Sequence, residues 1–138
     1  LSEVTGLAES PSLVVADVSF ISLSLILPAI DRVASPDADV IVLIKPQFEV
    51  GRVRDGVVTD SALRAEAMRI VLRAAGEQHL AIQCLKRSPI EGGQGNREFL
   101  GHFTRGPVPD PTEWEQRITT LAGDSHEHDA DPRANGAA

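Results

Sequence analysis

The chain has 138 residues, of which 42% are hydrophobic and 24% charged, and this composition indicates one ordinary globular domain with a core of its own. The longest apolar run, residues 20–30, is well short of the roughly 20 residues that a bilayer span requires, so we expect no membrane segment. The formal net charge is −7, but residues 1–105 contain 13 acidic and 11 basic residues, whereas residues 106–138 contain 7 and 2. Most of the acidity is therefore carboxyl-terminal, and the remainder is compatible with a nucleic-acid partner.

Two apolar runs, each followed by a polar residue, predict two parallel strands. Residues 13–16 precede Asp17, and residues 40–44 precede Lys45. Near-continuous apolar runs of this length are typical of strands that are buried on both faces of a parallel sheet. Residues 22–37 supply a connection of helical length, in which Pro28 is expected to kink the helix or mark its start. The predicted unit is strand, helix, strand.

A second helix is predicted to begin after Asp60 or Ser61, either of which is a suitable N-cap. Gly76 is placed to end this helix, because glycine adopts the left-handed conformation common at helix ends. The apolar positions of this helix recur at helical spacing, and they are Leu63, Ala67, Ile70, Val71 and Ala74.

Two further strands are predicted at residues 80–88 and 97–104. They are joined by the glycine-rich segment 89–96, which is too short for a parallel crossover. The fourth strand is therefore expected to run antiparallel, as in a hairpin. The fold class that follows is α/β, with parallel strands and a final antiparallel strand.

The single cysteine and the carboxyl-terminal segment set two further expectations. Cys84 has no partner for an internal disulfide, which favours a reducing, cytoplasmic location. Thr112 with Glu115 forms a capping-box pattern that predicts one short helix around Trp114. From Gly123 onward the composition lacks apolar residues for a core. We therefore divide the chain into a unit of residues 1–105 and an acidic, largely disordered tail of residues 106–138.

Three chemically useful side chains are expected at one edge of the sheet. Asp17 and Lys45 follow parallel strands, and Glu98 lies where the antiparallel strand begins, so all three belong to the edge where open α/β sheets bind ligands. Each has a simpler interpretation: a cap or turn for the aspartate, at about even odds, and solvated surface for the other two. Only two of the 13 basic residues are lysines. A lysine here indicates a need for an amine that can lose its proton, which arginine cannot do.

The tripeptide Gly-Gly-Gln at residues 92–94 is also the hydrolytic motif of peptide release factors. A motif this short needs its structural context to be informative. Here the context is a hairpin loop in an α/β sheet, whereas release factors carry the motif on a different fold in a longer chain. We interpret Gly92, Gly93 and Gly95 as turn glycines that let the backbone pass close to a ligand.

Four segments, in this order, strongly resemble the second half of the haemolysin-A-like (TlyA) ribosomal RNA methyltransferases of the FtsJ-like superfamily: VVADVSFISLSLILPA, DVIVLIKPQFEVGR, GVVTDSALR and SPIEGGQGNREF. The resemblance covers residues 11–103. It implies the carboxyl half of a Rossmann-like methyltransferase sheet and transfer of a methyl group from S-adenosylmethionine to a ribose 2′-hydroxyl of ribosomal RNA. The family uses a Lys-Asp-Lys-Glu tetrad, and the resemblance assigns its Asp, second Lys and Glu to Asp17, Lys45 and Glu98. By the same resemblance, Asp17 lies near the methyl donor.

The first lysine of that tetrad and the glycine-rich cofactor loop have no counterpart in this chain. Nor does the amino-terminal RNA-binding module of the family. We therefore expect the fragment to be inactive alone and to leave an open edge beside its first strand. A non-catalytic RNA-binding remnant of the fold is the alternative. Pore formation, which the family's name brings to mind, has no supporting amphipathic or apolar segment.

Contacts with ribosomal RNA or ribosomal subunits are expected from basic side chains near the same edge, because cations there meet phosphates. Solvated surface is an equally good interpretation for any one of them. Phe48 could stack on a base, although core packing is the better interpretation. We expect no metal site, since His126 and His128 are close together only in the predicted disordered tail. The basic residues are Arg52, Arg54, Lys86, Arg87 and Arg97.

Overall fold

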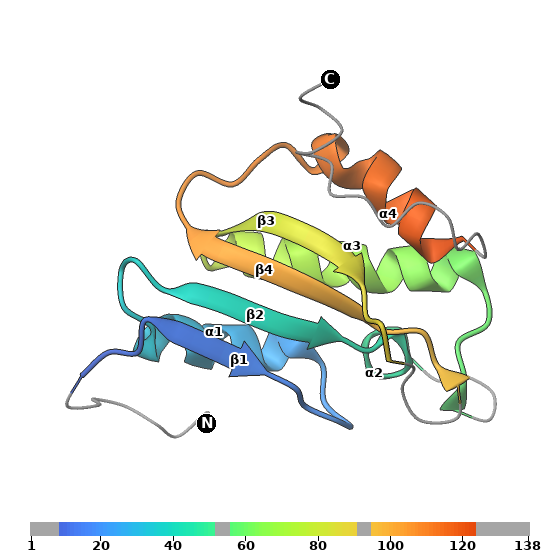
Figure 1. Ribbon diagram of the computed structural model, residues 1–138, viewed down its shortest axis with the longest axis horizontal. Helices are drawn as coiled ribbons and strands as arrows, with labels where there is room; N and C mark the ends of the chain where they lie inside the picture. The colour runs from blue at the N-terminus through green and yellow to red at the C-terminus, as the bar shows by residue number, and fades with distance from the viewer. Residues whose placement is uncertain (1–8, 52–55, 91–94, 124–138) are drawn as a thin grey trace.

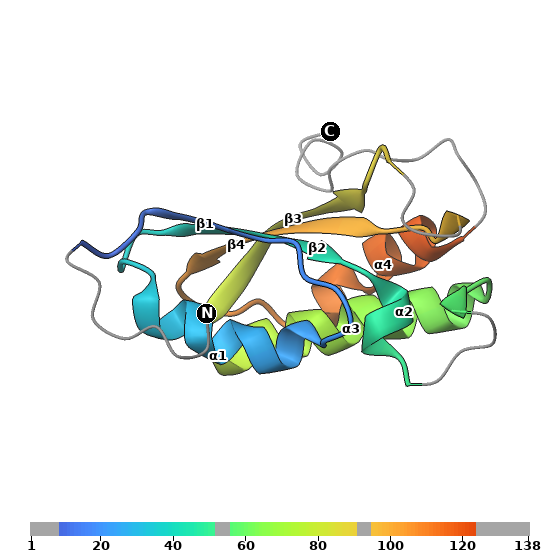
Figure 2. The ribbon, with the colours of Figure 1, turned by 90° about the horizontal axis from the view of Figure 1, so that it is seen from below.

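The computed structural model describes residues 9–51, 56–90 and 95–123. One four-stranded sheet, in the order β1-β2-β4-β3, carries its helices on a single face, as Figure 2 shows for α1, α3 and α4. The strands are β1 Leu13–Ala16, β2 Asp39–Ile44, β3 Leu80–Arg87 and β4 Phe99–Arg105. The helices are α1 Leu23–Val33, α2 Pro46–Glu49, α3 Ser61–Glu77, the 3₁₀ helix η3 Pro111–Trp114, and α4 Glu115–Ala122.

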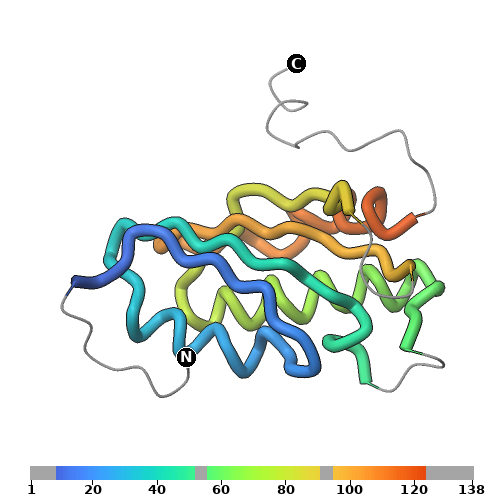
Figure 3. Tube along the Cα trace, turned by 60° about the horizontal axis from the view of Figure 1, so that its bottom comes forward, coloured from blue at the N-terminus to red at the C-terminus, as the bar shows by residue number. Residues whose placement is uncertain are grey.

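The sheet topology confirms the predicted mixed sheet. β1 and β2 are parallel, and β4 is antiparallel to both β2 and β3. β4 lies between β2 and β3 in space although it follows β3 in sequence (Figure 1, Figure 3). Ile44 is the register partner of Phe99, so the residue after β2 lies across from the residue before β4. This topology brings Lys45 and Glu98 to neighbouring strand ends.

Helix α1 is capped at both ends by side chains. The Ser22 hydroxyl accepts a hydrogen bond from the backbone N–H of Ser24 at 3.1 Å. Pro28 lies inside the helix, which continues past it. At the carboxyl end, the Arg105 guanidinium donates to the backbone oxygens of Asp31 and Ala34 at 2.6 and 3.0 Å, and it also pairs with the Asp31 carboxylate. These contacts satisfy carbonyl groups that have no partner within the helix.

Helix α3 confirms one predicted cap and corrects two details. Asp60 is the N-cap, and its carboxylate accepts from the backbone N–H of Ala62 at 2.8 Å. The helix does not end at Gly76 but continues to Glu77. Gly76 serves packing instead, because a Cβ there would lie 3.2 Å from Cγ1 of Val108. The buried stripe is also shifted from the predicted one, since Leu63 is 38% exposed and the stripe consists of Arg64, Ala65, Ala67, Met68, Val71 and Ala75.

The carboxyl-terminal elements pack into the core. Trp114, Ile118 and Leu121 are buried with residues of the sheet and α3. The predicted Thr112 cap is wrong: Asp110 caps η3, and its carboxylate accepts from both the N–H and the hydroxyl of Thr112. The aspartate precedes the first helical turn and so reaches the N–H groups that lack helical partners. Residues 124–138 lie outside the described part, so the predicted disorder there remains a prediction.

The two edges of the sheet differ. Among the residues that the structure describes, β1 pairs with β2 alone, and its side chains Leu13 and Val15 are 57% and 66% exposed. Within that part of the chain, β1 is therefore an edge strand. On the other edge, Arg117 of α4 donates to the backbone oxygen of Leu85 at 2.9 Å, so this carbonyl of β3 has a partner outside the sheet. Within residues 9–51, 56–90 and 95–123, no helix is long and apolar enough to cross a bilayer.

Candidate active site

An ion pair joins the ends of the two parallel strands. Lys45 follows β2, and its Nζ lies 2.6 Å from Oδ1 of Asp17, which follows β1. Nζ also donates to the hydroxyl of Ser19 at 3.1 Å. The lysine side chain is 13% exposed and the aspartate side chain 63%. The lysine side chain is therefore largely buried, while the side chain of its carboxylate partner is exposed.

Glu98 lies beside this pair and is 6% exposed. Its Oε2 accepts a hydrogen bond at 3.2 Å from the side-chain amide of Gln47, two residues after Lys45. The Gln47 amide oxygen is buried and has no partner in the described part of the chain. The three predicted residues thus converge at one edge, but the hydrogen-bond partner of the glutamate is Gln47.

Two aromatic rings pack against each other, Phe20 from the loop after β1 and Phe48 from α2. The ring centroids of Phe20 and Phe48 are 4.9 Å apart, with the planes tilted by 51°. Phe20 is 91% exposed and has a backbone φ of 64°, a left-handed value that is unfavourable for a residue with a Cβ. The exposed ring on strained backbone makes Phe20 a candidate for a functional contact.

Glu49, at the end of α2, contacts the start of α1. Its Oε1 accepts from the Ser22 hydroxyl at 2.6 Å, and its Oε2 accepts from the backbone N–H of Leu23 at 2.9 Å. Burial raises the pKa of the Glu49 carboxyl above its ordinary value, although the two hydrogen bonds act in the opposite direction.

Asn96 connects the loop before Glu98 to the loop before α3. It is 2% exposed; its amide oxygen accepts from the N–H of Val58 at 2.9 Å, and its amide nitrogen donates to the oxygen of Gly56 at 2.8 Å. Gly95 has a φ of 79°, which supports its interpretation as a turn glycine. The other two predicted turn glycines, at positions 92 and 93, lie outside the described residues.

The predicted RNA-contacting residues have mixed surroundings. Arg52 and Arg54 lie outside the described residues. Lys86 is exposed on β3, and Arg87 is half-buried where that strand ends. Arg97 donates to the backbone oxygen of Gly123, so part of its hydrogen-bonding capacity serves the fold. The structure thus leaves Lys86 as the most accessible of these cations in the described part.

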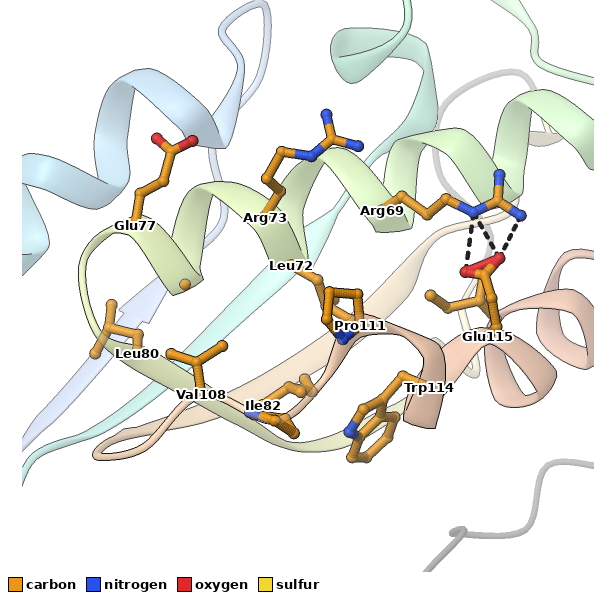
Figure 4. A pocket seen from close by; sticks show the side chains of 13 residues that line it. Arg69, Leu72, Arg73, Glu77, Leu80, Ile82, Val108, Pro111, Trp114 and Glu115 are labelled. Atoms are coloured by element: carbon orange, nitrogen blue, oxygen red, sulfur yellow. Dashed lines mark hydrogen bonds and ion pairs between the residues drawn. The ribbon is translucent and has the colours of Figure 1, made fainter.

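A cavity of about 340 Å³ lies elsewhere, between α3, the first residues of β3 and the η3–α4 segment (Figure 4). Its lining is largely apolar and includes Leu72, Val108 and Trp114, and the ion pair of Arg69 and Glu115 lies at one end. β3 runs in the same direction as β1 and β2 and starts at the end of the sheet where they start. The site around Lys45 lies at the other end of these strands, so the cavity is separate from it. No group of three or more potential metal ligands was found within residues 9–51, 56–90 and 95–123.

Sequence reasoning did not assign three of the side chains at this site. Ser19, Gln47 and Glu49 contact the ion pair, Glu98 and α1 respectively. The sequence feature that could have identified them is their position: they lie in the same two short segments as Asp17 and Lys45, immediately after the apolar strands. Residues that follow strand ends at a ligand-binding edge are candidates as a group.

Known proteins share this arrangement of sequence and fold. The FtsJ-like methyltransferase family model matches residues 2–105. The chain is 49% identical over 91 residues, 64% of its length, to the 16S/23S rRNA (cytidine-2′-O)-methyltransferase TlyA of Mycobacterium tuberculosis, and covers 34% of that protein. It is 40% identical over 96 residues, 67% of its length, to YqxC of Bacillus subtilis, named as a candidate rRNA methyltransferase, and covers 34% of that protein. The chain thus spans about a third of these relatives.

A solved structure agrees with these matches. A protein named as a candidate hemolysin from Streptococcus thermophilus superposes with a TM-score of 0.76 at 37% identity, covering 83% of this chain and 43% of that one. The matched region includes the strand ends with the ion pair and Glu98. The chain therefore belongs to the FtsJ-like methyltransferase family, and within it to the TlyA group.

Proposed function

We propose that this chain forms the catalytic carboxyl-terminal part of a ribosomal RNA ribose 2′-O-methyltransferase that uses S-adenosylmethionine. The observation that carries the proposal is the enclosed Lys45 amine, 2.6 Å from Asp17 and beside the buried Glu98. A ribose hydroxyl is a poor nucleophile, and its reaction with a methyl donor requires alignment and removal of a proton. The carboxylates would supply the alignment, and the amine, when neutral, would accept the proton.

In this proposal, Lys45 takes the proton from the 2′-hydroxyl when its amine is neutral. Arg could not replace it, because a guanidinium does not give up its proton. Asp17 would orient the neutral amine by accepting a hydrogen bond from it at the position of the present ion pair, and Glu98, oriented by Gln47, would accept a hydrogen bond from the amine or the ribose. These roles assign proton transfer to one residue and positioning to two.

The residues present are compatible with a sulfonium donor. The Asp17 carboxylate is 63% exposed at the carboxyl end of β1, where α/β sheets bind ligands, and a carboxylate favours a nearby positive charge. S-adenosylmethionine, when bound, supplies an activated methyl group with a good leaving group. The residues of this chain would align the reactants, remove the proton and place the Asp17 carboxylate near the positive charge of the donor.

The RNA surface in this proposal is the rim of the same site. Phe20 offers an exposed ring on which a nucleobase could stack, supported from behind by Phe48. Lys86 would provide a cation for phosphates, and so would Arg52 and Arg54, which lie outside the described residues. The substrate would be ribosomal RNA or a ribosomal subunit, which implies action in the cytoplasm.

The test is a chimera in which residues 9–105 of this chain replace the corresponding residues of the Mycobacterium tuberculosis relative. It is incubated with labelled S-adenosylmethionine and ribosomal subunits that lack the modification. A 2′-O-methyl group blocks alkaline cleavage of the adjacent phosphodiester, so methylated positions appear as gaps in a cleavage ladder. New gaps that vanish in the Lys45→Ala chimera would support the proposal.

The rival function is RNA binding without methyl transfer. A folded chimera that binds the cofactor and the RNA but leaves no gaps in the ladder would favour that rival. The 138-residue chain alone is expected not to bind S-adenosylmethionine, and calorimetric titration measures this directly. Detectable binding would contradict the expected inactivity of the isolated chain.

A further inference from the structure

The loops that carry the proposed catalytic residues are joined at three points. The first loop, residues 17–22, connects β1 to α1. The second connection, residues 45–50, follows β2 and contains the short helix α2; we refer to it as the second loop. Lys45 makes one junction, through its ion pair with Asp17 and its hydrogen bond to Ser19 at 3.1 Å, and the aromatic pair is another. The third is the contact of Glu49 with the start of α1. The first junction involves proposed catalytic residues, whereas the third involves neither Lys45 nor Asp17.

Glu49 makes this third junction with both of its oxygens. Each carboxylate oxygen takes a separate donor, the Ser22 hydroxyl at 2.6 Å and the Leu23 N–H at 2.9 Å. The first N–H groups of a helix have no partner within it, and the helix dipole favours a negative charge there. The Ser22 oxygen in turn accepts from the N–H of Ser24. The glutamate therefore completes the cap of α1 from another part of the chain.

The distance along the chain between Glu49 and Lys45 is one helical turn. Lys45 is the N-cap of α2. Two backbone hydrogen bonds close that turn: the N–H of Phe48 donates to the oxygen of Lys45 at 2.9 Å, and the N–H of Val50 donates to the oxygen of Pro46 at 3.1 Å. Anchoring Glu49 on α1 consequently fixes the direction in which the chain leaves β2 at Lys45. It also fixes the end of the first loop, five residues after Asp17.

The ion pair needs such support. Asp17 is 63% exposed, so packing does little to hold its carboxylate in one place, and an exposed ion pair by itself is a weak constraint. The Glu49 contacts are less exposed and involve a charged acceptor, which makes them stronger than neutral hydrogen bonds. A small displacement of a catalytic group is known to cost much more in rate than in binding.

We propose that Glu49 is a positioning residue that sets the geometry of the Lys45 and Asp17 pair by clamping the second loop to α1. This inference rests on the proposed function for its effect on rate, but the effect on geometry is a property of the 138-residue chain. Burial raises the pKa of the carboxyl, and its two donors favour the ionised form. Burial outweighs the two hydrogen bonds, so the pKa of the Glu49 carboxyl lies above its ordinary value.

The geometric arm uses the 138-residue chain, which has only two lysines, Lys45 and Lys86. Carbon-13 labelling of the lysine Cε groups gives two NMR signals, and Lys86→Arg assigns them. We expect the two Hε protons of Lys45 to be non-equivalent, as in a fixed side chain, and to become equivalent in Glu49→Ala. Glu77→Ala, an exposed glutamate on α3, is the matched control and should leave the signal unchanged.

The kinetic arm uses the chimera. Glu49→Ala should lower kcat by about 10- to 100-fold with KM for RNA changed less than about threefold, because misplacement affects the transition state more than binding. Glu49→Gln retains one acceptor and should recover part of the rate. If Glu49→Ala does not fold, Ser22→Ala, which leaves the Leu23 bond intact, should give a smaller decrease of the same kind.

The outcomes separate the two proposals. A folded Glu49→Ala chain in which the Lys45 signal is unchanged would overturn the clamp, whatever the chimera does. An inactive parent chimera with an altered Lys45 signal would contradict the proposed function while supporting the clamp. An effect of Glu49→Ala on KM alone would also refute a positioning role. So would a decrease in kcat no larger than that of the Glu77→Ala control.

Discussion

Replacing Lys45 by arginine separates the charge of this residue from its capacity to lose a proton. The guanidinium retains the positive charge and can pair with Asp17, but it remains protonated at any pH of interest. If Lys45 is the base, Lys45→Arg should abolish methyl transfer almost as completely as Lys45→Ala. If the residue supplies only charge, Lys45→Arg should retain most of the rate.

The expected size of the effect follows from the role and the surroundings. A general base contributes about 10²- to 10⁴-fold to the rate, which corresponds to ~3–5 kcal/mol of transition-state stabilisation. Its contribution to folding is far smaller, because Asp17 is 63% exposed and such a pair is worth about 0–1 kcal/mol. Both variants should therefore melt within a few degrees of the parent.

The assay is single-turnover methylation by the chimera at saturating RNA and cofactor, so that the rate reports the chemical step. Circular dichroism melting of the same preparations checks the fold. A Lys45→Arg rate within about tenfold of the parent would refute the base assignment, since proton transfer alone is worth more than that. A melting point lowered by ten degrees or more in either variant would refute the estimate of the ion pair's contribution to stability.

Three further predictions concern the surface, the fold and its pH dependence. Phe20→Ala should weaken RNA binding by the chimera by about 5- to 100-fold in a filter-binding assay, as expected for ~1–3 kcal/mol per stacked base. Phe20→Tyr should retain the affinity of the parent. Equal affinities of the parent and Phe20→Ala would exclude stacking. Arg105→Ala should lower the free energy of unfolding in urea by about 2–3 kcal/mol, because carbonyl groups at the end of α1 lose their donors, whereas Arg73→Ala on the exposed face of α3 should change it little. The pKa of the Glu49 carboxyl is higher in the folded chain than in the unfolded chain, where it is near 4.5. Between these two values the folded chain holds a proton on Glu49 that the unfolded chain has released. The contribution of Glu49 to the free energy of unfolding should therefore fall as the pH rises from 4.5 through the raised pKa. Because other carboxyl groups also titrate, the test compares two chains: between pH 4 and 7 the urea midpoint of the parent should fall relative to that of Glu49→Gln, and parallel curves would contradict this.

Much of the fold was predictable because the local signals agree with the tertiary arrangement. Apolar runs before Asp17 and Lys45 gave two parallel strands, and the short glycine-rich connection required an antiparallel fourth strand. The Asp60 cap was predictable because its side chain serves the N–H groups of its own helix.

The errors arose where a neighbour distant in sequence decided the outcome. Gly76 does not end α3, and it is close to Val108, more than thirty residues later in the chain. Leu63 has helical spacing, yet it faces solvent, because the sheet covers the stripe that includes Ala67 and Val71. The spacing of apolar residues predicts that a helix has an apolar face. It does not determine which residues of that face the neighbouring elements bury.

The sequence by itself determined that Asp17, Lys45 and Glu98 would meet at one edge, because parallel strands end on the same side and a hairpin returns there. Only the tertiary structure decided how they meet. It paired Lys45 with Asp17, gave Glu98 a hydrogen bond from Gln47, and placed Glu49 on the first turn of α1. Such contacts depend on ångström-scale distances between loops that are 26 to 51 residues apart in sequence. Composition and periodicity specify which residues share an edge, but packing selects the partner that each side chain takes.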